Sequence, residues 1–254
     1  YAKRIQGSIL PRVDDLKSVI PNSFIYFLPR DIVSGDFYYI DKCGDKLIVG
    51  CVDCTGHGVP GGFMSMIGSV TLRNIYNANQ VRGVWQTPEL ILEALDHEIE
   101  LILKQNVIHE DELNEFYKSR DGMDMTLIEI DLKTQEVLLA AAMRTSLIYV
   151  DGELEVIPGT KRPIGGGDTL TMPFELKKFK FKKGEGLYLF TDGYTDQFGG
   201  PQGRKLKLSG VKEIVKSIQE YPNSERESMI KDVFEDWLSD YPQIDDVLFI
   251  GIEF

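Results

Sequence analysis

The chain has 254 residues, 43% of them hydrophobic, which is enough to enclose one large core in one or two domains. Its formal net charge of −12 argues against nucleic acid or an anionic membrane surface as a partner, because both attract basic surfaces. We find no apolar run of the length that a membrane span requires. The odd number of cysteines, 3, does not suit a disulfide framework and favours a reducing, cytoplasmic location.

Residues 1–20 are predicted to form a linker helix ahead of a main domain at 21–254. Apolar residues recur there at near-helical spacing, which Pro11 interrupts and Pro21 ends. Because the chain begins with Tyr1 rather than Met, we expect this helix to continue from an upstream regulatory region. A larger, membrane-anchored sensor with this domain in the cytosol is one form that such a protein would take. We therefore hypothesise that the helix transmits an upstream signal to the main domain, with homodimerisation as one route.

The remaining elements follow from hydrophobic period and turn signals. Strands are predicted at 24–28, 36–40, 46–53, 125–131, 136–142, 146–150, 153–157, 177–181, 186–190 and 247–254. Helices are predicted at 63–78, 87–100, 209–220 and 223–240, and the polar segment 106–122 is predicted to be a surface loop or short helix. Because helices interrupt antiparallel hairpins and do not follow every strand, this order predicts an α+β fold and excludes a doubly wound parallel sheet.

Four aspartates stand at the ends or edges of the predicted strands: Asp36, Asp53, Asp192 and Asp245. A lone carboxylate at the edge of a core is costly unless it is paired or bound to a metal. Taken singly, each of these residues also fits an ordinary turn or loop. Their joint occurrence predicts a site for a hard divalent cation, Mg²⁺ or Mn²⁺, which prefers oxygen ligands.

Asp53 leads into a glycine-rich loop, TGHGVPGG. The loop lacks both the G-x-G-x-x-G pattern and the lysine of a P-loop, so a nucleotide-binding interpretation fails. The Asp53 carboxylate and the Cys54 carbonyl would instead suit a cation. Cys51 and Cys54 have C-x-x-C spacing but no second pair, and they are interpreted as small core residues.

Seven motifs occur along the chain in a fixed order: IQGSILP, PRDIVSGDFYY, VDCTGHGVPGGFMSMIG, DGMDMTLIEID, GTKRPIGG, LYLFTDGYTDQFG and DDVLFIGIEF. In this order they resemble the metal-dependent Ser/Thr protein phosphatases of the PPM (PP2C-like) group, in the bacterial SpoIIE/RsbU branch. The resemblance implies an α-β-β-α sandwich of two antiparallel sheets flanked by helices. It also implies two Mn²⁺ or Mg²⁺ ions at one sheet edge and hydrolysis of phosphoserine or phosphothreonine in a partner protein.

The resemblance also implies roles for individual positions. Asp53 bridges both ions and Asp36 holds one directly or through water, while the Cys54 carbonyl, Asp192 and Asp245 complete the pair. Asp121 or Asp124 lies where some relatives bind a weaker third ion; a loop acid and a strand-capping acid are the alternatives. A metal-bridged hydroxide would attack the phosphomonoester in line, without a covalent enzyme intermediate.

Two helper residues are open to either of two interpretations. Arg30 would hold the substrate phosphate as a bidentate fork, or it is a surface arginine. His57 would protonate the leaving oxygen, or it donates to loop backbone. Ser34, Tyr39 and the segment AAMRTS (141–146) depart from the family pattern, which leaves substrate recognition open.

By analogy, the partner is expected to be a phosphorylated regulatory protein, for example a STAS-type antagonist. One alternative is a degenerate phosphatase-fold module that binds a phosphoprotein without hydrolysing it. Another is a two-metal phosphoesterase acting on nucleotides or small phosphates, which would show an aromatic or arginine-rich pocket for a base.

Overall fold

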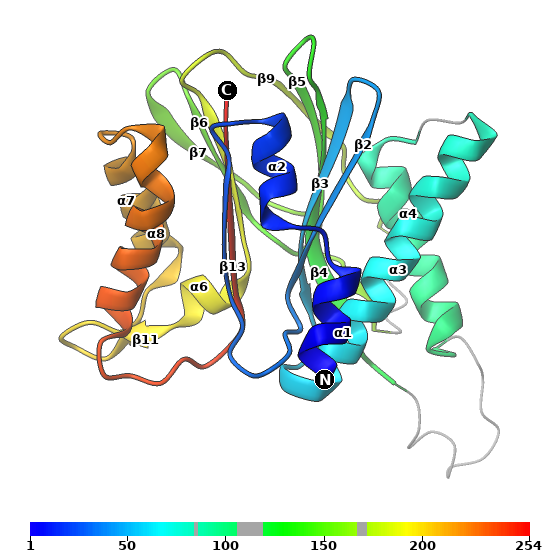
Figure 1. The fold of residues 1–254 in the computed structure, drawn as a ribbon, viewed down its shortest axis with the longest axis horizontal. Coiled ribbons are helices and arrows are strands. Elements are labelled where there is room, and N and C mark those ends of the chain that lie inside the picture. The colour runs from blue at the N-terminus through cyan, green and yellow to red at the C-terminus, as the bar shows by residue number, and fades with distance from the viewer. Residues whose placement is uncertain (84–85, 106–118, 167–171) are drawn as a thin grey trace.

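The computed structural model describes residues 1–83, 86–105, 119–166 and 172–254. Two antiparallel sheets lie face to face, and helices cover the outer face of each (Figure 1). The predicted α-β-β-α sandwich is therefore confirmed. Most of the predicted polar segment 106–122 lies outside the described residues. Within the part of the chain that the structure describes, no helix is both long and apolar enough to cross a membrane.

The two sheets are built from strands that lie far apart in the sequence. The five-stranded sheet has the order β1 (Phe24–Leu28), β13 (Val247–Glu253), β10 (Gly186–Phe190), β6 (Ser146–Val150) and β7 (Glu153–Ile157). The six-stranded sheet has the order β2 (Phe37–Cys43), β3 (Lys46–Cys54), β4 (Gly122–Asp131), β5 (Glu136–Ala142) and β9 (Lys177–Lys180), with β8 (Ile164–Gly165) paired to β4. A short ribbon of β11 (Phe198–Gly199) and β12 (Arg204–Lys205) lies apart from both.

Strand alternation divides the apolar residues between three layers of core. In β3, Leu47, Val49 and Cys51 face the opposite sheet, whereas Ile48 and Val52 face the helices on the outer side. Successive side chains of a strand point to opposite faces, so one apolar run serves two cores. This explains why β3 reads as continuously hydrophobic although it belongs to an antiparallel sheet.

A pair of helices covers each outer face. Helices α3 (Gly58–Arg82) and α4 (Pro88–Ile102) bury residues such as Leu72 and Leu92 on the six-stranded sheet. Helices α7 (Lys207–Ile218) and α8 (Asn223–Leu238) bury Val215 and Phe234 on the five-stranded sheet. Figure 1 shows the two pairs at opposite sides of the molecule.

The N-terminal segment, predicted as a linker helix that Pro11 interrupts, forms two helices. Helix α1 (Ala2–Ile9) ends at Leu10, whose ψ of 147° is extended, and α2 (Val13–Val19) begins three residues later. Pro11 explains the break, because it disfavours a helical conformation at the preceding residue. In α1 the Gln6 amide donates to the Ser34 carbonyl (2.6 Å) and to Ser65 Oγ (2.9 Å). Helix α1 is thereby attached to the loop that leads to Asp36.

Helix α3 begins earlier than predicted, within the glycine-rich loop at Gly58. Glycine is needed at Gly61 and Gly35 because the backbone packs too closely there for a Cβ atom. A Cβ atom on Gly61 would lie 2.2 Å from the Gly56 carbonyl oxygen, and one on Gly35 would lie 2.4 Å from the same atom. The loops after Asp53 and before Asp36 are therefore packed against each other.

The packing between the sheets predicts the effect of truncating one residue at its centre. Ile250 on β13 is fully buried between the sheets. We expect Ile250→Ala to lower the free energy of unfolding by about 2–5 kcal/mol, because it leaves a cavity in the core. Val156→Ala on the edge strand β7, where the side chain is 38% exposed, should cost less than about 1 kcal/mol. Chemical denaturation measures both, and equal losses would contradict this assignment of the core.

Candidate metal centre

The predicted acids come together at one edge of the sandwich. Asp36 directly precedes β2, Asp53 lies near the end of β3, and Asp245 precedes β13. Asp192 opens the short helix α6 (Asp192–Asp196), which is separated from the end of β10 by one residue. A cavity of about 510 Å³ is lined by several of these groups, namely Asp53, Cys54, Asp124, Asp192 and Asp245. Residues from both sheets thus converge on a single space.

The antiparallel register places two of the acids side by side. Asp53 on β3 is paired directly with Asp124 on β4. Like charges directly opposite each other on neighbouring strands are unfavourable. This pair therefore needs a cation nearby.

Asp246 positions the loop that carries Asp36. Its buried carboxylate accepts hydrogen bonds from the backbone N–H of Arg30 and of Gly35, each at 2.7 Å. Hydrogen bonds from backbone donors satisfy a buried carboxylate without a metal. Of the two adjacent acids, Asp246 therefore supports the loop, and Asp245 lines the cavity.

The electrostatics of Asp36 and Asp53 favour a bound cation. Asp36 is only 3% exposed, and in the described structure neither its Oδ2 atom nor that of Asp53 has a hydrogen-bond partner. Burial raises the pKa of Asp36 well above its usual value, and repulsion from Asp53 raises it further. The pKa of Asp53 is raised in the same way, first by burial and then by Asp192. Buried carboxylates whose oxygens lack hydrogen-bond donors fit the hard divalent cations predicted from the sequence.

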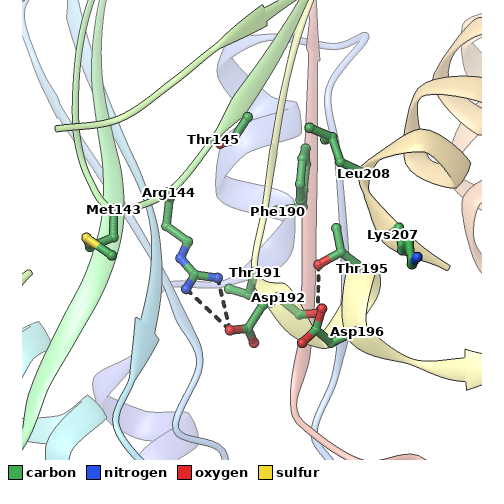
Figure 2. Close-up of a pocket in the computed structure, with 10 residues that line it drawn as sticks. All are labelled: Met143, Arg144, Thr145, Phe190, Thr191, Asp192, Thr195, Asp196, Lys207 and Leu208. Atoms are coloured by element: carbon green, nitrogen blue, oxygen red, sulfur yellow. Dashed lines mark hydrogen bonds and ion pairs between the residues drawn. The ribbon is translucent and has the colours of Figure 1, made fainter. Parts of the chain in front are cut away.

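Arg144 lies among these acids, and the sequence analysis missed its role. Its Nη2 atom is 2.6 Å from Asp124 Oδ2, and its Nη1 atom is 3.2 Å from Asp53 Oδ2 and 3.3 Å from Asp192 Oδ2. Figure 2 shows the guanidinium directed at the Asp192 carboxylate. Among the described residues, no three acidic, histidine or cysteine side chains are gathered closely enough to hold an ion as they stand. Binding of an ion would therefore require the guanidinium to give up some of these contacts.

The connection between β5 and β6 places Arg144 in the cavity. Met143, directly before it, has a left-handed backbone with φ of 61°, which is unfavourable for a residue with a side chain. The Met143 N–H donates to the Thr160 carbonyl at 2.7 Å, and this bond helps to hold the turn. The departure from the family pattern at 141–146 was the only sequence signal for this residue.

The other predicted residues lie outside the lining of this cavity. The Arg30 side chain is exposed and donates to the Ile244 carbonyl at 2.7 Å. His57 Nδ1 is 3.0 Å from Asp31 Oδ2 at the start of α3, and Asp121 Oδ2 accepts a hydrogen bond from the Ser119 hydroxyl at 2.8 Å. The roles of Arg30, His57 and Asp121 stay predictions.

The lining adds one cation that was not singled out, Arg120. Cys51 and Cys54 are free and buried, and burial raises the pKa of both thiols well above the usual value. Their interpretation as core residues is confirmed.

Comparison with known proteins agrees with this geometry. The family model of Stage II sporulation protein E (SpoIIE) matches residues 44–254. The SiaA-PP2C domain of Pseudomonas aeruginosa is 27% identical, with a TM-score of 0.84 over 100% of this chain and 94% of that one. The SpoIIE phosphatase domain with a regulatory fragment, from Bacillus subtilis, is 16% identical, with a TM-score of 0.70 over 91% of this chain and 62% of that one.

A third similar structure contains the RsbU and RsbW domains of a Mycobacterium tuberculosis protein. It is 20% identical, with a TM-score of 0.67 over 92% of this chain and 60% of that one. A search of curated protein sequences found no match. The fold and the acidic cavity define a PP2C-like phosphatase domain. The chain belongs to the SpoIIE family, in its SpoIIE/RsbU-type branch.

The raised pKa of Asp36 predicts how the stability of the metal-free protein depends on pH. An acid whose pKa is higher in the folded state than in the unfolded state does not lower the free energy of unfolding at pH values below its unfolded pKa, which is about 4. As the pH rises above that value, the acid destabilises the fold. We expect Asp36→Asn to stabilise the metal-free protein at neutral pH, with a gain that shrinks toward pH 4 or so. Urea denaturation in the presence of a chelator measures this difference.

Asp96→Asn is the matched control for that measurement. The Asp96 carboxylate is also buried, but it is paired with Arg162 and accepts a hydrogen bond from the Gly165 N–H at 2.6 Å. The same substitution should therefore destabilise the protein at neutral pH. A loss of stability in Asp36→Asn equal to that in the control would contradict the account of the acidic cluster.

Proposed function

We propose that this chain is a Mn²⁺- or Mg²⁺-dependent protein serine/threonine phosphatase that acts on a phosphorylated signalling protein. The observation that carries the proposal is the convergence of Asp53, Asp124, Asp192 and Asp245 on one cavity, with Asp36 buried near Asp53. The Oδ2 atoms of Asp36 and Asp53, which have no hydrogen-bond partner among the described residues, support it further. Metal dependence is typical of the PP2C family.

In this proposal the ions are held by Asp36, Asp53, the Cys54 carbonyl, Asp192 and Asp245. When bound, they would lower the pKa of water and neutralise charge on the phosphoryl oxygens. Asp246 keeps the 30–35 loop, and with it Asp36, in place. His57, whose Nδ1 atom contacts Asp31, is the candidate for protonating the leaving oxygen, and Arg30 is the candidate for holding the phosphate.

The surroundings of the cavity favour a phosphoprotein over a nucleotide. The described residues that line the 510 Å³ cavity include no aromatic side chain on which a base would stack. Of the two arginines in the lining, Arg144 contacts carboxylates and Arg120 is exposed. A second cavity of about 280 Å³ adjoins it, since both are lined by Arg144 and Asp192 (Figure 2). Met143, Phe190 and Leu208 give this second cavity an apolar part, which suits a side chain that neighbours the phosphorylated residue.

The proposed partner is a regulatory phosphoprotein in the cytoplasm, for example a STAS-type antagonist. The similarity to the SiaA and RsbU domains supports a regulatory partner. Homodimerisation through the N-terminal helices belongs to the same proposal. The alternative, a phosphatase fold that binds without hydrolysis, is less favoured because all four acids predicted as ligands are present and converge.

Hydrolysis of a generic phosphomonoester, with Mn²⁺ and with a chelator, tests the proposal. We expect metal-dependent turnover in the parent and a loss on the order of 100-fold or more in Asp53→Ala and in Asp192→Ala, since each removes a carboxylate from the cation site. A phosphopeptide and a cyclic nucleotide, compared as substrates, distinguish a protein phosphatase from a general phosphoesterase.

Asp232→Ala provides the control, because Asp232 is an exposed acid on α8, outside the cavity lining. This variant should retain the parent's turnover. Metal-dependent activity that survives both Asp53→Ala and Asp192→Ala would exclude the proposed centre.

A further inference from the structure

The acidic cavity contains its own cation. Asp36, Asp53, Asp124, Asp192 and Asp245 carry five negative charges when all are ionised. Besides burial, repulsion from Asp53 raises the pKa of Asp36, and repulsion from Asp192 raises that of Asp53. Two divalent ions would supply four positive charges, and the Arg144 guanidinium supplies the fifth. Arg120 also lines the cavity but is exposed to solvent, and the Asp246 carboxylate is satisfied by two backbone N–H groups, so neither is counted here. The remaining groups are electrically balanced with two ions, and a third ion would leave them with excess positive charge.

The contacts of Arg144 are not equal. The shortest is to Asp124 at 2.6 Å, whereas the contacts to Asp53 and Asp192 are 3.2 and 3.3 Å. Asp53 and Asp192 are also the acids that the proposed function assigns to the two ions. The guanidinium can therefore give up its two longer contacts and keep the short one when ions bind.

Arg144 is held in this position and is not a mobile surface residue. Its side chain is 18% exposed, and the left-handed turn at Met143 fixes the backbone next to it. Asp124 lies opposite Asp53 in the β3–β4 register, so it needs a cation whether or not ions are bound. Asp121, the other acid considered for a third ion, is exposed and bonded to Ser119.

We propose that Arg144 acts as a built-in third cation of this centre, which neutralises Asp124 and so limits the site to two divalent ions. The inference rests on the proposed function, because it presupposes that the cavity binds metal. It implies that a chain with a neutral residue at position 144 binds an additional ion at Asp124.

Titration with Mn²⁺ tests this directly, by calorimetry and by the electron paramagnetic resonance signal of the free ion. The parent should bind two ions. Arg144→Gln should bind three, the third through Asp124, because the substitution removes the charge but keeps a polar side chain of moderate length. The double variant Arg144→Gln/Asp124→Asn should return to two, and Arg144→Lys, which retains a positive charge, should also bind two.

Arg226→Gln is the matched control, because Arg226 forms another buried arginine–carboxylate pair, with Glu253, outside the cavity lining. It should bind two ions even where its stability falls. Circular dichroism establishes that each variant is folded, and Arg144→Met, which is likewise neutral and is expected to bind three ions, replaces Arg144→Gln if that variant does not fold.

Three results would overturn the inference: two ions in folded Arg144→Gln, three ions in the parent, or three ions in Arg144→Lys. A parent that binds no Mn²⁺ would overturn both this inference and the proposed function. A parent that binds two ions, with no change in Arg144→Gln, would overturn the inference alone.

Discussion

Carboxylates that are held close together away from water repel one another, and the edge of this sandwich is built around that repulsion. Asp36 and Asp53 are buried, Asp36 Oδ2 has no hydrogen-bond partner, and Asp124 lies directly opposite Asp53 on the next strand. Each of these features opposes folding of the metal-free chain. The fold can hold them because large apolar cores on both sides of each sheet fix the strand ends in place.

The acids at this edge differ in the groups that surround them. Asp246 receives two backbone N–H groups and serves the loop, whereas Asp245, its neighbour, lines the cavity. Arg144 offsets part of the charge from a connection that crosses between the sheets. Gln6 attaches helix α1 to the backbone of Ser34, two residues before Asp36. A displacement of α1 would thus move the backbone at Ser34 and, two residues later, Asp36.

The sequence predicted the layers and the acids well, because both depend on local patterns. Strand alternation and the positions of acids at strand ends are visible without knowledge of the fold. The interruption at Pro11 is also visible in the sequence, and α1 and α2 lie on either side of it. The sequence predicts a later start for α3, because several glycines close together normally indicate a loop. In the fold these glycines allow Gly61 to pack closely on Gly56, and the helix already begins at Gly58.

Arg144 could not be predicted from local pattern. Its segment, AAMRTS, contains no acid or glycine signal, and its role depends on three carboxylates that lie 20 to 91 residues away in the chain. The separation of Asp245 from Asp246 likewise depends on which backbone groups the fold brings to each. The carboxylates that repel one another can therefore be predicted from the sequence, whereas the groups that offset their charge are visible only in the fold.

The central claim is that divalent cations relieve repulsion among these buried acids. Its most direct test is the melting temperature of the parent chain at neutral pH as a function of free Mn²⁺. Because ions that bind only the folded state stabilise it by mass action, the account predicts a melting temperature that rises continuously with Mn²⁺ concentration. A melting temperature that stays unchanged or falls across the titration would contradict it.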